Sequence, residues 1–188
     1  MESVMSPGRV LLSQTQIRAR VRQLGRNITR HYRRPSPHGQ RPFFLGVMNG
    51  ALFFLGDLLR AVDLDHVEIS CVRLASYAGA QSTGSLRGLA GLDALGKSVA
   101  GRRVLIVDDI LDTGRTLSAL AARLKKLGAA DVKICVLLEK RRAHEIPVRA
   151  DWTGFKIADA FVVGYGLDYN GRYRTLKQIR VLSTDCGK

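Results

Sequence analysis

Residues 104–116 read Val-Leu-Ile-Val-Asp-Asp-Ile-Leu-Asp-Thr-Gly-Arg-Thr, and this is the most informative stretch of the chain. The apolar run from Val104 to Val107 predicts a buried strand. Two adjacent carboxylates follow at the end of that strand, and a third comes three residues later. A helical pattern with Leu117 and Leu120 begins directly after Thr116. Acids beside a turn that suits phosphate are typical of a site for a substrate with both sugar hydroxyls and a phosphate.

The turn between this strand and this helix has a composition suited to anion binding. It offers backbone N–H groups at a helix start, two hydroxyls and a guanidinium, which together would hold a monophosphate. Asp108 and Asp109 can accept hydrogen bonds from vicinal sugar hydroxyls. One carboxylate would be explained as a helix cap, but three exceed what a cap requires. The GxxxxGK[ST] spacing of a nucleotide P-loop is absent. The predicted 5′-phosphate-binding residues are Asp112, Thr113, Gly114, Arg115 and Thr116.

The rest of the chain alternates strand and helix patterns. Because such alternation predicts a parallel sheet covered on both faces, the expected fold class is α/β, with ligands bound at the carboxyl ends of the strands. The chain of 188 residues is expected to form one domain, 1–188, with loose tails at about 1–9 and 184–188. A first helix is expected after Ser13, with Gln16 completing a capping box, and it should end before Pro35. Further helices are expected over 51–62 and 117–127, and strands over 43–48, 67–74, 104–107, 132–138, 161–165 and 179–182.

Composition limits the classes of protein to consider. No apolar run is long enough to cross a membrane and no signal-peptide pattern is present, so a cytoplasmic protein without membrane contact is expected. The three cysteines lack metal-ligand spacing, which agrees with a reducing compartment. The net charge is +14, and most of the excess lies in 1–41 and 172–188. A basic surface of this kind either attracts polyanions or is a solvated exterior.

Several motifs resemble those of a known family. The segment 106–116 is similar to the phosphoribosyl-pyrophosphate signature of type I phosphoribosyltransferases. The run Leu74-Ala75-Ser76-Tyr77 and the later Gln81-Ser82-Thr83-Gly84 resemble the flexible catalytic loop of hypoxanthine-guanine phosphoribosyltransferases. Glu139-Lys140 and the block 161–169, Phe-Val-Val-Gly-Tyr-Gly-Leu-Asp-Tyr, resemble the purine-binding region of that branch. The resemblance spans roughly residues 10–183. It implies a twisted parallel sheet flanked by helices, with a small hood formed by the terminal segments.

The resemblance also implies which residues contact a 6-oxopurine. Phe161 would stack on the base and the Val162 backbone would pair with its edge, while Asp168 lies in the same block. Lys140 would donate to the 6-oxygen. Adenine lacks that acceptor and would be rejected, because a buried unpaired ammonium is costly.

Further residues are implied for the pyrophosphate and for a lid. Met48, Asn49 and Gly50 correspond to the family's pyrophosphate loop, which often contains a cis peptide bond, here Met48–Asn49. Asn49 stands where a lysine is common, so one positive charge is missing from this loop. Arg174 falls where this branch has a pyrophosphate-binding arginine. The small-residue loop 75–91, with Ser76 and Tyr77, would close over the site and exclude water.

The implied reaction is transfer of a 5-phosphoribosyl group from phosphoribosyl pyrophosphate to hypoxanthine or guanine, which gives IMP or GMP and pyrophosphate. Asp112 would handle the proton at N7 of the purine as the catalytic base. Mg²⁺ is the expected cofactor, with Asp168, Asp108 and Asp109 as its carboxylates. Because members of this family form dimers and tetramers, the resemblance also implies a homo-oligomer, either a dimer or a tetramer.

One alternative comes from another class of protein. Attenuators of pyrimidine operons share the phosphoribosyltransferase fold and bind RNA, and the basic ends of this chain would suit such a regulator. Asp112 and the 161–169 block look instead like the purine-salvage branch, so nucleic acid is not expected as a partner.

Overall fold

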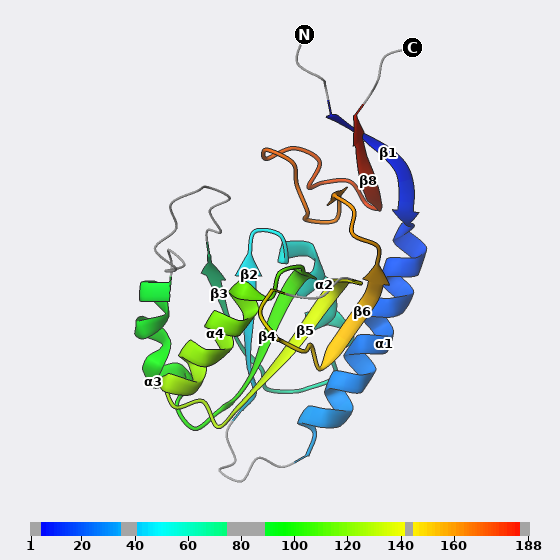
Figure 1. Cartoon of the computed structure of the whole chain (residues 1–188). Coiled ribbons are helices and arrows are strands. Elements are labelled where there is room, and N and C mark those ends of the chain that lie inside the picture. Colours follow the sequence, from blue (N-terminus) through cyan, green and yellow to red (C-terminus); the bar gives the residue numbers. More distant parts are fainter. Residues whose placement is uncertain (1–4, 35–40, 75–88, 142–144, 185–188) are drawn as a thin grey trace.

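The computed structural model describes residues 5–34, 41–74, 89–141 and 145–184, and its centre is a five-stranded parallel sheet (Figure 1). The strand order is β3-β2-β4-β5-β6. All four neighbouring pairs run parallel. These strands are β2 (Phe43–Met48), β3 (Glu68–Arg73), β4 (Arg103–Leu111), β5 (Asp131–Lys140) and β6 (Trp152–Ile157). The parallel α/β class predicted from the alternating pattern is therefore confirmed.

Helices cover both faces of this sheet, which explains why the central strands are apolar without interruption. Along β4, Leu105 and Val107 belong to the core beneath α1 (Gln14–Tyr32) and α2 (Leu52–Ala61). The alternate residues, Val104 and Ile106, belong to a second core beneath α4 (Arg115–Lys126), the short helix α3 (Gly96–Val99) and the 3-10 turn η1 (Leu89–Leu95). Both faces of each central strand are thus buried.

The predicted start of α1 is confirmed in atomic detail. The Ser13 hydroxyl accepts a hydrogen bond from the Gln16 N–H at 3.3 Å, and the Gln16 side chain accepts from the Ser13 N–H at 2.9 Å. This capping box satisfies two N–H groups that have no partner within the helix.

Among the described residues, no helix combines the length and the apolar character that crossing a bilayer requires.

The chain ends form a second, smaller sheet above the first, which is the predicted hood (Figure 1). Its antiparallel order is β1-β8-β7, where β1 is Met5–Leu12, β7 is Val162–Val163 and β8 is Ile179–Thr184. Loose tails at 1–9 and 184–188 were expected, and this was wrong for 5–9 and for 184, because Met5 pairs with Thr184. The partners lie at opposite ends of the chain, and such long-range pairing leaves no signal in the local sequence.

Three strands of the described structure also differ from expectation. The edge strand β6 was not predicted. The strand expected over 161–165 is reduced to β7, because Gly164, Tyr165 and Gly166 all have positive φ and turn the chain. Strand β4 continues to Leu111, so the carboxylates of Asp108 and Asp109 lie within the strand rather than after it.

Candidate active site

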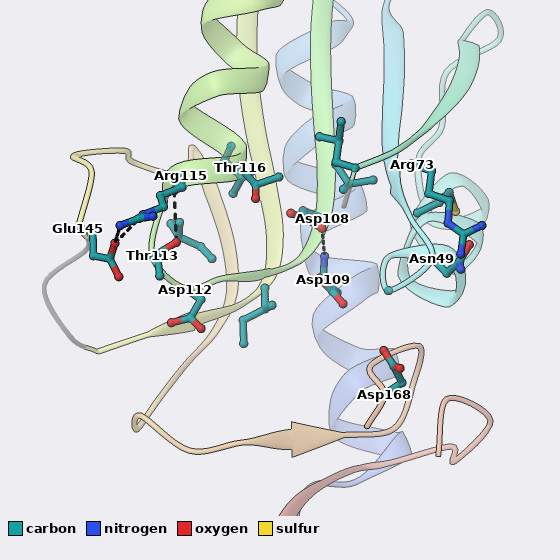
Figure 2. Close-up of a pocket in the computed structure, with 18 of the residues that line it drawn as sticks. Asn49, Arg73, Asp108, Asp109, Asp112, Thr113, Arg115, Thr116, Glu145 and Asp168 are labelled. Carbon is teal, nitrogen blue, oxygen red and sulfur yellow. Dashed lines mark hydrogen bonds and ion pairs between the residues drawn. The ribbon is translucent and has the colours of Figure 1, made fainter. Parts of the chain in front are cut away.

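A cavity of about 1060 Å³ opens at the carboxyl ends of β2, β3 and β4 (Figure 2). Its wall comes from the loop after β2, the end of β3, the β4–α4 turn and two residues of the hood. Parallel strands end at the same edge of a sheet, so segments far apart in sequence meet there. The predicted site residues in this wall are Met48, Asn49, Gly50, Asp108, Asp109, Asp112, Thr113, Gly114, Arg115, Thr116, Asp168 and Arg174.

The β4–α4 turn brings a helix start to the cavity. Gly114 caps α4 with φ of 84°, a left-handed conformation that glycine adopts readily. The Arg115 N–H donates to the Thr113 hydroxyl at 3.4 Å. The Arg115 guanidinium approaches Glu145 Oε2 at 2.6 Å through both Nε and Nη2. N–H groups at a helix start, hydroxyls and a guanidinium together form an arrangement that suits a phosphate.

The two neighbouring carboxylates of β4 lie deep at the cavity floor. Asp108 is 6% exposed and accepts a hydrogen bond from the Asp109 N–H at 2.9 Å. Burial raises the pKa of Asp108 well above its usual range, and the neighbouring Asp109 charge raises it further. Burial also raises the pKa of Asp109. Buried carboxylates in this state gain most from hydrogen-bond donors or a cation brought by a ligand.

The loop after β2 packs tightly on this floor. A Cβ at Gly50 would lie 1.8 Å from Asp109 Oδ2, so any side chain there would displace the carboxylate. The Met48–Asn49 peptide bond is cis, as the resemblance implied. A Cβ at Gly166, in the hood, would lie 2.0 Å from the Gly50 carbonyl oxygen. Two glycines thus let the loop, the strand and the hood approach one another closely.

Asp168 and Arg174 form the hood side of the cavity. Their side chains pair at 2.7 Å. Asp168 also accepts from the Gly171 N–H at 2.7 Å, and Arg174 donates to the Gly166 carbonyl at 2.7 Å. These bonds hold a carboxylate and a guanidinium in the wall of the cavity that the loop after β2 also lines.

Lys140, at the end of β5, contacts the turn from the side. Its ammonium lies 3.2 Å from Asp112 Oδ2 and 2.8 Å from Asp159 Oδ1, and its side chain is only 12% exposed. Phe161 is 53% exposed and meets the Tyr169 ring edge-on, with centroids 5.8 Å apart. Val162 is buried in β7. Among the described residues these three lie outside the wall of the large cavity, and Lys140 connects to it through Asp112.

Some of the expected features lie elsewhere or were missed. Ser76 and Tyr77, predicted for the lid, fall outside the described residues. Sequence reasoning missed Arg73, Glu145 and Asp159, which line the cavity or hold residues beside it. For Arg73 a signal existed, since it ends a strand directly before the loop motif. The partners of Arg115 and Lys140 lie in irregular segments, where no periodicity marks them.

The carboxylates of the cavity can be tested against a divalent ion. In the described ranges no group of three or more His, Cys, Asp or Glu side chains is placed to hold a metal by protein ligands alone. Mg²⁺ usually keeps several waters and binds through one or two carboxylates and substrate phosphates. Asp108, Asp109 and Asp168 share one cavity and offer only oxygen donors, so this set fits Mg²⁺ bound together with a phosphorylated ligand.

The chain is similar to known proteins along nearly its whole length. The phosphoribosyl transferase domain matches residues 12–170. The hypoxanthine-guanine phosphoribosyltransferase of Bacillus subtilis is 39% identical over 175 residues, which cover 93% of this chain and 92% of that protein. The bifunctional protein TilS/HprT of Listeria monocytogenes is 39% identical over 178 residues, and the match spans 94% of this chain but only 26% of that protein.

A solved structure agrees with these matches. Hypoxanthine phosphoribosyltransferase from Trypanosoma cruzi, in complex with the product IMP, is 31% identical and superposes with a TM-score of 0.80. The superposition covers 100% of this chain and 98% of that one. Sequence and structure therefore agree on one family.

Proposed function

The chain belongs to the phosphoribosyl transferase family and groups with its hypoxanthine-guanine branch, and we propose that it transfers a 5-phosphoribosyl group from phosphoribosyl pyrophosphate to hypoxanthine or guanine. The products are IMP or GMP and pyrophosphate. The relatives that cover most of this chain carry the name of that activity. An RNA-binding regulator is not favoured, because these relatives are transferases.

The observation that supports the proposal most directly is the ion pair between Lys140 and Asp112, which lies at the β4–α4 turn. In a 6-oxopurine, the 6-oxygen and N7 point to the same side of the base. A donor and an acceptor 3.2 Å apart complement that edge, with Lys140 facing the oxygen and Asp112 facing N7. Adenine carries an amino group at this place, so the ammonium would lose its acceptor and the base would be rejected.

The donor is bound by the cavity. Residues 113–116 hold the 5′-phosphate at the start of α4, and Asp108 and Asp109 accept from the ribose hydroxyls. Backbone groups of the 48–50 loop and the Arg174 guanidinium contact the pyrophosphate. Phe161 and Val162 complete the purine pocket by stacking and by backbone pairing.

The chemical step follows from these positions. The bond between the sugar C1′ and the pyrophosphate oxygen breaks, and the purine N9 forms its bond to C1′ on the opposite side. The proton on N7 moves to the Asp112 carboxylate, so charge does not accumulate on the base. A positioned base of this kind contributes about 10²–10⁴-fold to the rate. The lid predicted over 75–91, of which 75–88 lie outside the described residues, would exclude water, which otherwise hydrolyses the donor.

We propose Mg²⁺ as the cofactor, held by Asp168 together with Asp108 or Asp109 and the donor's oxygens. When bound, it supplies positive charge that stabilises the developing negative charge on pyrophosphate.

A cytoplasmic location and a dimer or tetramer remain predictions. Sedimentation analysis of the purified chain tests the oligomeric state.

A direct assay tests the proposed activity. The purified chain is incubated with phosphoribosyl pyrophosphate, MgCl₂ and, separately, hypoxanthine, guanine, xanthine, adenine or uracil. We expect nucleotide and pyrophosphate to form with hypoxanthine or guanine and not with adenine or uracil. Consumption of adenine at the same rate, or of no base at all, would show that the proposal is wrong. In the Lys140→Ala variant we expect a large loss of affinity for the oxopurine.

A further inference from the structure

The cationic side chains of the cavity wall differ in whether they form ion pairs within the protein. Three arginines line it: Arg73, Arg115 and Arg174. Arg115 is paired with Glu145 and Arg174 with Asp168. Within the described part of the chain, the Arg73 guanidinium makes no ion pair or hydrogen bond. Among the described residues of the wall, it is therefore the cation whose charge is not already balanced by a described carboxylate.

The position of Arg73 beside the loop after β2 indicates which part of a ligand its charge can contact. Arg73 is the last residue of β3 and pairs in register with Met48, the last residue of β2. Asn49 follows at once and is neutral, so the loop after β2 brings no cation of its own to this flank. Figure 2 shows Arg73 and Asn49 next to each other, on the flank of the cavity away from Arg115 and Glu145.

The remaining charge of the wall makes a cation on this flank important. Five carboxylates line the cavity, namely those of Asp108, Asp109, Asp112, Glu145 and Asp168. A leaving group with several negative oxygens would be repelled by this set unless cations lie on its own side. Arginine suits the task, because its planar fork of N–H groups can donate two parallel hydrogen bonds to a phosphate.

We propose that Arg73 binds the pyrophosphate group of the donor and of the product, and so supplies from the neighbouring strand the positive charge that Asn49 does not provide. The inference rests on the proposed function and assigns a new binding residue to it. Sequence position alone hides this relation, because Asn49 follows β2 whereas Arg73 ends β3. Their closeness results from the parallel pairing of β2 and β3.

The test measures binding and turnover in the full chain. In the Arg73→Gln variant, the KM for phosphoribosyl pyrophosphate and the Kd for inorganic pyrophosphate in MgCl₂ should both rise about tenfold to a hundredfold, the range for loss of a charge-assisted hydrogen bond. The KM for hypoxanthine should stay at its wild-type value, since the proposed purine contacts come from the end of β5, the β4–α4 turn and the start of β7 rather than from β3. Arg60→Gln is the matched control, because Arg60 is exposed on α2 and lies outside the cavity wall.

A charge-relocation variant separates binding from a merely structural role. Adding Asn49→Lys to Arg73→Gln should return most of the lost pyrophosphate affinity, because the cation is restored on the adjoining strand. Calorimetric titration with inorganic pyrophosphate gives this result without turnover. Thermal unfolding of each variant identifies any that fail to fold, and Arg73→Lys, which keeps the charge, should retain part of the affinity.

The outcomes distinguish this inference from the proposed function. If the wild-type chain turns over oxopurines while Arg73→Gln keeps the wild-type KM for the donor and Kd for pyrophosphate, the inference is wrong and the proposed function stands. If affinity falls in Arg73→Gln but Asn49→Lys restores none of it, Arg73 acts through structure and the inference is also wrong. If the wild-type chain neither reacts nor binds pyrophosphate, the proposed function fails and the inference fails with it.

Discussion

Replacing Gly50 by alanine is a sharp perturbation of the candidate site. The new Cβ would lie 1.8 Å from Asp109 Oδ2 and 2.5 Å from its Cγ. Carbon contacts are favourable only at about 3.5–4.0 Å, so the carboxylate must move by more than about 1.5 Å. The methyl group thus moves one of the two proposed ribose ligands out of place without removing it.

The size of the effect follows from this displacement. A misplacement of about 1 Å can cost about 10²-fold in rate, so kcat/KM for phosphoribosyl pyrophosphate should fall by at least that factor, which corresponds to about 2.7 kcal/mol. The free energy of unfolding should fall by about 1–3 kcal/mol, the usual cost of overpacking.

Gly56→Ala provides the matched control. Gly56 lies in α2 on the same segment of chain, and nothing lies within 4 Å of its Cβ position. Alanine in an exposed helix is favoured over glycine by about 0.5–1 kcal/mol, so this variant should melt slightly higher and retain full activity. Steady-state kinetics with varied donor, together with thermal unfolding, measures both effects. A folded Gly50→Ala variant with wild-type kcat/KM for the donor would refute the role given to Asp109.

Three further predictions concern the catalytic base Asp112, the ion pair that Lys140 forms with Asp159, and the cysteines. Asp112→Asn should lower nucleotide formation by about 10²–10⁴-fold while 5′-phosphate binding, measured by titration with IMP, persists; unchanged turnover would remove Asp112 from the mechanism. Asp159→Asn removes one of the two carboxylates that hold the Lys140 ammonium, so the KM for hypoxanthine should rise severalfold with the donor KM unchanged, and a rise in both would argue for general disruption. Cys71 is exposed, whereas burial raises the pKa of the Cys135 thiol, so iodoacetamide followed by peptide mass analysis should label Cys71 in the folded chain and Cys135 only after unfolding; rapid native labelling of Cys135 would contradict its burial.

The central part of the fold could be predicted because local sequence specifies it. The apolar run of β4, the turn glycine and the leucines of α4 occur within one short segment, and each local preference agrees with the final structure. The capping box at Ser13 is equally local. Because the carboxyl ends of parallel strands share one edge of the sheet, residues that follow different strands could be assigned to one cavity from the sequence alone.

What could not be predicted depends on contacts between distant segments. The β1–β8 pairing joins the two ends of the chain, and β6 gains its position only as an edge strand beside β5. At the site, the strand expected over 67–74 already contained Arg73, but only the pairing of β2 with β3 shows that Arg73 lies beside Asn49. The Asp159 contact to Lys140 depends likewise on how the segment between β6 and β7 folds back.

A crystal structure of the chain with IMP would show whether the β4–α4 turn is the nucleotide site. We expect the 5′-phosphate at residues 113–116, the ribose hydroxyls at Asp108 and Asp109, and the base with its 6-oxygen at Lys140. Nucleotide bound elsewhere, with the β4–α4 turn vacant at saturating IMP, would contradict it.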